Sequence, residues 1–195
     1  MISVAVAWLK GRAMNTPIQR YNNTAMALHW LMALLIFAAF PLGVYMHDLP
    51  LSPTKLQYYS YHKWIGITIL LLVIARVVWR FTHTPPPLPA STPRLEVVVS
   101  HITHLALYGL LIAIPLSGWL MSSAKGFQTV WFGVLPLPDL VEKNKELGEL
   151  LVTVHQGLNV FLFLLVGMHI AAVIKHKFID RDQILERMLP KGKSK

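Results

Sequence analysis

Four long apolar segments, separated by polar or proline-containing stretches, dominate the pattern of hydrophobic and polar positions along the chain. About 20 apolar residues in a helix span the hydrocarbon core of a bilayer, which is roughly 30 Å thick. Each segment is close to this length, so the pattern predicts an all-α fold, an integral membrane four-helix bundle. The expected spans run from about Thr24 to Met46, Tyr61 to Val78, Val97 to Met121, and Leu150 to Ile174.

The composition agrees with a membrane protein and removes several other classes. Of the 195 residues, 54% are hydrophobic and 14% are charged, whereas a soluble domain has about 25% charged residues. The chain has no cysteine, which excludes disulfides, iron–sulfur clusters, thiolate zinc sites and the Cys-x-x-Cys-His attachment of c-type haem. Nine histidines remain, and these carry the candidate chemistry.

The distribution of positive charge orients the bundle. Thirteen of the 18 Lys and Arg residues fall on the side that holds both chain ends, and five fall on the other side. The positive-inside rule therefore predicts that both termini are cytoplasmic. Basic segments beside a membrane also bind anionic lipid headgroups. Membrane lipid thus explains the net charge of +9, and no nucleic-acid partner is expected.

The four spans divide the chain into three parts. Residues 1–20 are expected to form a cytoplasmic N-terminal extension, because Met1–Ala13 is only mildly apolar and short. No secretory cleavage signature precedes the first span, and Met14 is an alternative start. Residues 21–178 are predicted to form the four-helix transmembrane domain, followed by a basic cytoplasmic tail over residues 179–195.

Two connections between the spans differ in composition from their surroundings. Thr82–Pro93 contains five prolines, which favours a stiff, extended cytoplasmic crossing. Ser122–Glu149 is the longest connection, and it contains the apolar stretch Trp131–Pro138. This stretch predicts an interfacial segment that folds over the outer end of the bundle.

Two histidines of the fourth span indicate stacked cofactors. His155 and His169 are 14 residues apart, which corresponds to about 21 Å along a helix and to nearly four complete turns. Both rings therefore lie on one helix face, one near each membrane surface. Ionisable side chains at membrane depth are costly and usually functional, so this spacing predicts two cofactors, each held jointly with another helix.

The direction of each span pairs these histidines with two others. The first span runs outward and the fourth runs inward, so His29 and His169 both lie near the cytoplasmic side. His62 and His155 both lie at the outer starts of their spans. The predicted pairs are therefore His29 with His169 and His62 with His155, an arrangement that suits two six-coordinate haems in a bundle core.

Each histidine also has a simpler interpretation, as a hydrogen-bond partner between helices. Two level-matched pairs favour ligation over that interpretation. No acidic residue accompanies the histidines at membrane depth, which argues against a path for hydrated divalent ions.

Arg76 and His104 are further candidates at the cytoplasmic level. Arg76 follows His62 by 14 residues and so shares its helix face. A buried guanidinium there is expected to bind an anion or a carbonyl, such as a haem propionate or a quinone oxygen. His104 shares a face with His101, and we expect it to hydrogen-bond a propionate, a quinone or a neighbouring helix rather than to ligate.

Several segments together resemble the prokaryotic cytochrome b561 family. The resemblance covers nearly the whole chain from about Tyr21 onward. It implies a four-helix dihaem b protein of the bacterial inner membrane that exchanges electrons with quinone, with His29, His62, His155 and His169 as axial ligands. The segments are Ala27-Leu28-His29-Trp30, His62 followed by Gly66 and Arg76, His104–Leu120, and His169-x6-His176 followed by Phe178–Pro190.

Within that family, the resemblance favours a superoxide oxidase, which takes electrons from periplasmic superoxide and passes them to ubiquinone. Lys63, beside His62, and Lys125 are candidates to attract the superoxide anion, because a local positive patch raises encounter rates. The simpler interpretation of both lysines is that they reach the membrane interface.

Ubiquinone is expected at the cytoplasmic end. Arg76, His104, Lys175 and His176 are predicted to gather there, where His or Lys can supply protons. Lys175 stands where relatives can have a paired histidine, which is a departure from the family pattern. The alternative function is an electron-carrier or membrane-anchor subunit for a partner dehydrogenase or periplasmic redox protein, which would use the apolar outer stretch Phe127–Leu140.

Overall fold

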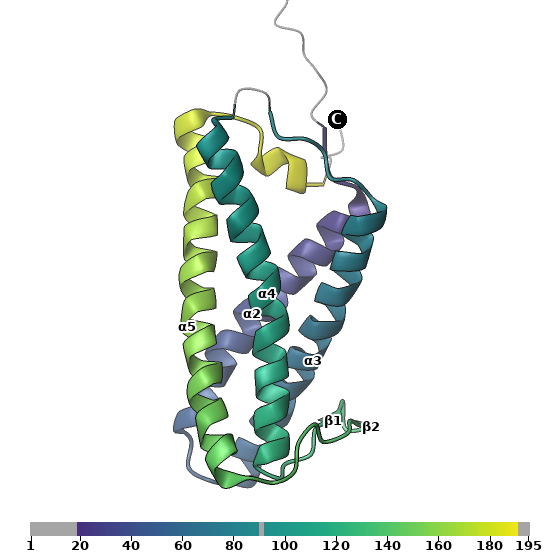
Figure 1. Cartoon of the computed structure of the whole chain (residues 1–195), viewed down its shortest axis with the longest axis vertical. Helices are drawn as coiled ribbons and strands as arrows, with labels where there is room; N and C mark the ends of the chain where they lie inside the picture. Colours follow the sequence, from purple (N-terminus) through teal and green to yellow (C-terminus); the bar gives the residue numbers. More distant parts are fainter. Residues whose placement is uncertain (1–18, 90–91, 191–195) are drawn as a thin grey trace, which may run out of the picture.

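The computed structural model describes residues 19–89 and 92–190, and these residues form a bundle of four long helices (Figure 1). Each helix is long and apolar enough to cross a membrane, which confirms the predicted all-α, four-helix membrane fold. Most of the N-terminal extension, the alternative start Met14 and the last five residues of the tail lie outside the described residues. The helices are α2 (Asn23–Asp48), α3 (Pro53–Thr82), α4 (Arg94–Ala124) and α5 (Lys145–Lys175).

The helices begin where the sequence supplies capping side chains. Asn22 precedes α2 and accepts a hydrogen bond from the amide of Ala25 at 2.8 Å. Ser52 caps α3 and is followed by a proline in the first helical position, where a missing amide costs nothing. Asn144 caps α5 by accepting from the amide of Leu147 at 3.0 Å.

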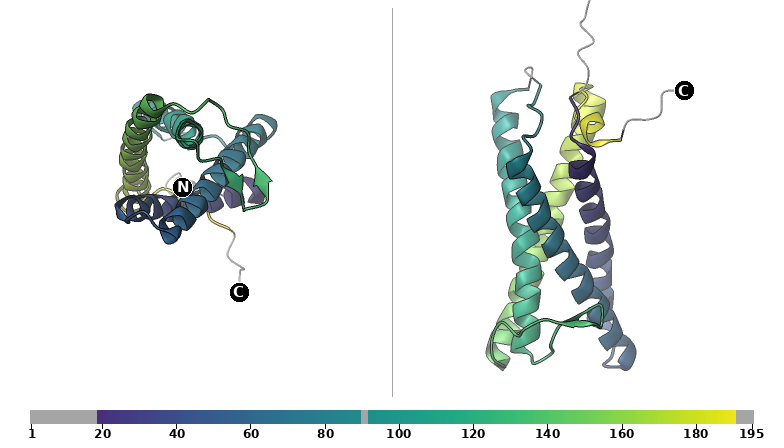
Figure 2. Two further views of the ribbon diagram at one scale, coloured as in Figure 1. Left: turned by 90° about the horizontal axis from the view of Figure 1, so that it is seen from below. Right: turned by 90° about the vertical axis from the view of Figure 1, so that its right-hand side faces the viewer.

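Neighbouring helices along the chain pack against one another: α2 on α3, α3 on α4, and α4 on α5. Seen along the bundle, the helices surround a common centre (Figure 2). One buried cluster joins α4 and α5, and a second joins α2 and α3. The clusters are Leu110, Ile114, Leu162 and Leu165, and Met32, Leu70 and Val73.

Most of the large apolar side chains point outward. Leu34 is 67% exposed and Phe81 is 87% exposed, which would be unfavourable in water but suits a surface in contact with lipid. Phe40 of α2 stacks on Phe163 of α5 with ring centroids 5.1 Å apart, and Phe163 is also largely exposed. The outward-facing surface of the bundle is therefore mainly apolar.

A short hairpin lies at one end of the bundle, which we call the hairpin end. Strands β1 (Val130–Trp131) and β2 (Leu135–Pro136) pair antiparallel, and the turn between them has positive φ at Phe132 and Gly133. The indole of Trp64 on α3 donates to the carbonyl of Val130 at 2.6 Å. The apolar stretch that the sequence singled out thus packs against α3 at this end (Figures 1 and 2).

The opposite end, where α2 begins and α5 ends, is called the terminal end. Here α5 continues into a π-helical turn, η1 (His176–Asp180), and then a 3-10 turn, η2 (Leu185–Met188). The guanidinium of Arg187, which is 6% exposed, donates to the carbonyls of Gln19, Pro86 and Pro87 at 3.1, 2.7 and 2.7 Å. This one side chain therefore ties the chain's C-terminal segment to the lead into α2 and to the proline-rich crossing.

Candidate cofactor site

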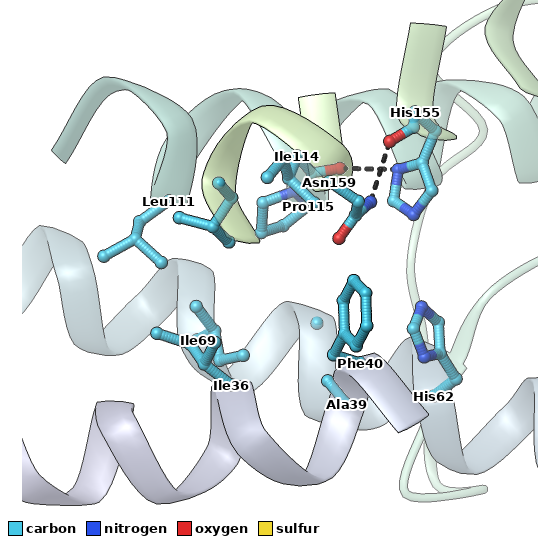
Figure 3. Close-up of a pocket in the computed structure, with 12 residues that line it drawn as sticks. Ile36, Ala39, Phe40, His62, Ile69, Leu111, Ile114, Pro115, His155 and Asn159 are labelled. Carbon is cyan, nitrogen blue, oxygen red and sulfur yellow. Dashed lines mark hydrogen bonds between the residues drawn. The ribbon is translucent and has the colours of Figure 1, made fainter. Parts of the chain in front are cut away.

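At the hairpin end, His62 of α3 and His155 of α5 face each other. Their ring centroids are 6.3 Å apart, and the ring planes are 80° from parallel. Figure 3 shows the two rings on opposite sides of a cavity, with Phe40 and Asn159 between their helices. The cavity has a volume of about 60 Å³ and is lined mainly by apolar side chains. The structure thus brings together the two histidines that the sequence paired.

Hydrogen bonds orient one of these two rings. Nδ1 of His155 lies 3.1 Å from the carbonyl oxygen of Ile114 and 2.9 Å from Oγ of Ser117. An imidazole that donates its Nδ1 hydrogen to these oxygens keeps Nε2 as the free nitrogen. Nδ1 of His62 is buried and has no hydrogen-bond partner among residues 19–89 and 92–190.

At the terminal end, three histidines come together instead of two. The His29 and His169 ring centroids are 6.4 Å apart, and those of His104 and His169 are 5.6 Å apart. Nδ1 of His104 also lies 3.3 Å from Oγ of Ser100. His29 and His169 thus lie together at the same end of the bundle, as expected, and His104 of α4 lies beside His169.

The spacing of the rings fits a metal held between two imidazoles. A metal–nitrogen bond to histidine is about 2.0–2.1 Å, so two such bonds and the depth of each ring place the ring centroids about 6 Å apart. The separations at the two predicted pairs, 6.3 and 6.4 Å, agree with this value. An added Cβ at Gly66, one turn beyond His62, would meet nothing within 4 Å among the described residues, and Gly66 lines the cavity between the two rings.

Arg76 of α3 contacts both α2 and α4 toward the terminal end of the bundle. Its Nε donates to the hydroxyl of Tyr108 on α4 at 3.0 Å, and its Nη1 donates to the carbonyl of Ala25 on α2 at 2.7 Å. A guanidinium has five N–H groups, so these two bonds fix its plane and leave other donors for an anionic or carbonyl ligand.

Lys175 and His176 lie in a separate network of carboxylates. Nζ of Lys175 is 3.0 Å from Glu96 and 2.6 Å from Asp180. Nδ1 of His176 is 2.7 Å from Asp182 and 3.1 Å from Asp180. The four residues predicted to gather at the cytoplasmic end therefore belong to two groups, Arg76 and His104 near the histidines, and Lys175 and His176 with the acids.

Both lysines at the hairpin end bind other parts of the chain. Nζ of Lys63 donates to Oγ of Ser122 at 3.1 Å and to the carbonyls of Phe127 and Gln128 at 3.3 and 3.2 Å. Nζ of Lys125 is 3.2 Å from Oε1 of Glu149. Lys63 thus anchors the loop that follows α4, while its positive charge stays one residue from His62.

Sequence reasoning missed several side chains that contact the site. Ser117 and Asn159 are polar residues within apolar spans, and that isolation was the available signal for both. Glu96, Asp180 and Asp182 were missed as partners of Lys175 and His176. Asp180 follows His176 by four residues, a spacing that brings side chains together on a helix, whereas Asp182 lies beyond Arg181, where the backbone turns with positive φ.

Residues 20–191 match the prokaryotic cytochrome b561 family. The chain is 35% identical over 189 residues to cytochrome b561 homolog 2 of Escherichia coli (strain K12), covering 92% of this chain and 96% of that protein. It is 28% identical over 184 residues to the probable superoxide oxidase CybB of Yersinia pestis, with 89% and 97% coverage. Cytochrome b561 homolog 1 of Escherichia coli (strain K12) is 26% identical over 187 residues, with 90% and 100% coverage.

The matched span includes all four membrane-spanning helices and every histidine of the two groups. The family consists of membrane electron-transfer proteins that bind haem b, and paired imidazoles within a helical bundle are a suitable site for that cofactor. The chain therefore belongs to the prokaryotic cytochrome b561 family.

Proposed function

We propose that this protein holds two haem b groups and conducts electrons between the two ends of its bundle. His62 and His155 would ligate the haem at the hairpin end, and His29 and His169 the haem at the terminal end. The observation that carries the proposal is the pair of imidazole separations, 6.3 and 6.4 Å, at two levels of the same helix, α5. When bound, a haem supplies one-electron redox chemistry at its iron.

The surrounding residues would orient the ligands and exclude water. The Ile114 carbonyl and Ser117 hydroxyl hold the His155 ring through Nδ1, which fixes the tautomer and strengthens Nε2 as an electron donor to a metal. Apolar residues line the space between the rings, among them Ile69 and Leu162. A dry, apolar lining of this kind lowers the local dielectric and keeps competing ligands away.

We further propose superoxide as the electron donor and ubiquinone as the acceptor. Two superoxide anions each lose one electron and become dioxygen. One ubiquinone gains these two electrons and two protons and becomes ubiquinol. The name of the Yersinia pestis relative, a probable superoxide oxidase, supports this choice, and so do the positive charges of Lys63 and Lys125 near the hairpin end. A local positive charge steers an approaching anion.

Under the same proposal, the termini and the terminal end face the cytoplasm of a bacterium, because the excess of Lys and Arg lies there. Ubiquinone would bind near Arg76 and His104, whose N–H groups can donate to its carbonyl oxygens. Lys175 and His176 would not contact the quinone directly under this proposal, because both are engaged by the carboxylates of Glu96, Asp180 and Asp182.

Haem content of single-ligand variants tests the ligand assignment. His155→Ala should lose the haem of the hairpin end and keep the other, and His169→Ala should do the reverse, as measured by pyridine haemochrome assay per mole of protein. His104→Ala should keep both haems. Two haems per chain in both His155→Ala and His169→Ala would refute the assignment.

Rapid mixing tests the reaction. Superoxide should reduce the haems of the purified protein within the mixing experiment, and superoxide dismutase should abolish that reduction. Arg76→Gln should keep reduction by superoxide but slow reoxidation by a short-chain ubiquinone. No reduction by superoxide would refute the donor, and unchanged reoxidation in Arg76→Gln would refute the quinone position.

The apolar surface of the hairpin end favours a second candidate function. Phe127, Phe132 and Val134 are 59%, 55% and 83% exposed, on an end that the charge distribution predicts to face outward. A partner dehydrogenase or periplasmic redox protein docking there would make the chain an electron-carrier or anchor subunit. Co-purification of a stoichiometric redox protein, lost when Phe132 and Val134 are changed to Ser, would support this function.

A further inference from the structure

Two helical glycines lie directly against the histidines of the hairpin end. A Cβ built on Gly43 of α2 would be 3.0 Å from Cε1 of His62, and one built on Gly118 of α4 would be 3.1 Å from Cε1 of His155. The distances to Nδ1, 3.5 and 3.4 Å, and to Nε2, 3.8 and 3.9 Å, also correspond. The same contact between a glycine and an imidazole therefore occurs twice, once in each half of the bundle.

A proline precedes the glycine in both helices, although the spacing differs. Gly43 follows Pro41 by two residues in α2, and Gly118 follows Pro115 by three in α4. In each half, the next helix along the chain carries the histidine: α3 follows α2 after residues 49–52, and α5 follows α4 after residues 125–144, which include β1 and β2. A proline inside a helix removes one backbone hydrogen bond, and the glycine beyond it has no Cβ to separate the helix backbone from the neighbouring ring.

We propose that Gly43 and Gly118 are positioning residues of the hairpin-end cofactor site. Each glycine allows the histidine ring of the next helix to pack directly against the backbone of the helix that carries the glycine. This inference rests on the proposed function, since it concerns the ligands of one of the two proposed haems. Its physical basis is the packing limit: a Cβ at 3.0–3.1 Å from a ring carbon requires the ring or the helix to shift by a few tenths of an ångström, and added volume of this kind in a packed site is unfavourable.

Other helical glycines show that this contact is specific to the site. A Cβ at Gly66, Gly109, Gly157 or Gly167 would meet nothing within 4 Å among the described residues. Gly148 faces the side chain of Lys125 instead. Gly109 is exposed and lies on the same helix, α4, as Gly118. The substitution Gly109→Ala is therefore a matched control, because the added methyl group contacts no histidine.

The two rings differ in what else restrains them. His155 is also held through Nδ1 by Ile114 and Ser117, whereas Nδ1 of His62 has no hydrogen-bond partner in the part of the chain that the structure describes. Packing against Gly43 therefore contributes more to holding the His62 ring than packing against Gly118 contributes to holding the His155 ring. We expect Gly43→Ala to change the orientation of its ligand more than Gly118→Ala does.

The test compares Gly43→Ala and Gly118→Ala with the control Gly109→Ala in the haem-loaded protein. Haem content, low-spin electron paramagnetic resonance spectra and a redox titration are measured for each, and the signal missing from His155→Ala identifies the hairpin-end haem. Each site variant should shift or lose that signal and move that haem's potential, with haem content falling from two toward one per chain. The other haem should keep its spectrum and potential, which shows that the bundle has folded.

Three results would overturn the inference. These are an unchanged hairpin-end signal in both site variants, equal changes in both haems, or an equal change in Gly109→Ala. The proposed function fails separately if His155→Ala removes no haem. If His155→Ala removes one haem while Gly43→Ala and Gly118→Ala leave its spectrum and potential unchanged, the ligand assignment stands and only the positioning role is refuted.

Discussion

Removing the hydroxyl of Ser117 should raise the reduction potential of one haem selectively. Ser117 is 6% exposed, and its Oγ lies 2.9 Å from Nδ1 of His155 and donates to the carbonyl of Ile114 at 2.8 Å. A hydrogen bond accepted from Nδ1–H makes the opposite nitrogen a stronger donor to the metal. That stronger donation stabilises the oxidised iron, so its loss in Ser117→Ala favours the reduced form.

The size of the shift follows from the hydrogen bond that is lost. A buried hydrogen bond contributes about 0.5–1.5 kcal/mol net, and about 59 mV corresponds to a tenfold change, roughly 1.4 kcal/mol, for a one-electron couple. If the whole bond distinguished the two oxidation states, the potential would rise by about 20–65 mV. This is an upper limit, because the Ile114 carbonyl still accepts from Nδ1 at 3.1 Å.

A spectroelectrochemical titration that resolves the two haems measures the effect. Ser60→Ala is the matched control, because the Ser60 hydroxyl donates within its own helix to the carbonyl of Leu56. The hairpin-end haem should shift upward in Ser117→Ala and stay unchanged in Ser60→Ala. A downward shift, no shift, or an equal shift of both haems would refute the reasoning.

Three other changes have defined expectations. Arg187→Gln should destabilise the terminal end by about 1.5–3 kcal/mol, because the buried guanidinium no longer donates to three carbonyl oxygens. Thermal unfolding in detergent measures this loss of stability, and an unchanged unfolding midpoint would contradict the expectation. Trp64→Phe removes the bond to Val130, worth about 1 kcal/mol, and should speed proteolysis within the hairpin; equal cleavage rates would contradict this. The hydrogen bond from Lys177 lowers the pKa of Glu186 below its ordinary value of 4.5. The stability contributed by this pair is therefore present at neutral pH and lost as pH falls through the lowered pKa. Lys177→Met should reduce the acid sensitivity of the unfolding midpoint, and an identical pH profile would count against the pair.

The sequence was sufficient for the fold because hydropathy and helix direction are properties of the chain itself. The four spans were located, but their ends were not, since hydropathy reports the thickness of the membrane rather than the end of a helix. α3 begins at Pro53, about two turns before the predicted span, because Ser52 and the following proline start it. α5 similarly begins at Lys145, directly after its capping residue Asn144.

The histidine pairs could be predicted because a 14-residue interval and alternating helix directions determine level and face. The carboxylate network could not be predicted, because it depends on the π-helical turn that brings Asp180 back toward Lys175 and on the approach of Glu96 from α4. Glu96 is far from Lys175 in the sequence, whereas Asp180 is only five residues away and its contact depends on the local geometry of the π-helical turn. The glycine contacts were missed because, like the contact of Glu96, they join different helices.

The rise of α5 sets how far apart the two histidine sites lie. Phe163 lies eight residues after His155 and six before His169, about 12 and 9 Å along the helix axis, and it stacks on Phe40 of α2 between the two levels. A single helix, α5, supplies one histidine to each end, while α2 and α3 supply their partners. The rise of α5 thus determines the distance between the two sites. The two sites differ in the helix that supplies the second histidine, which is α3 at the hairpin end and α2 at the terminal end.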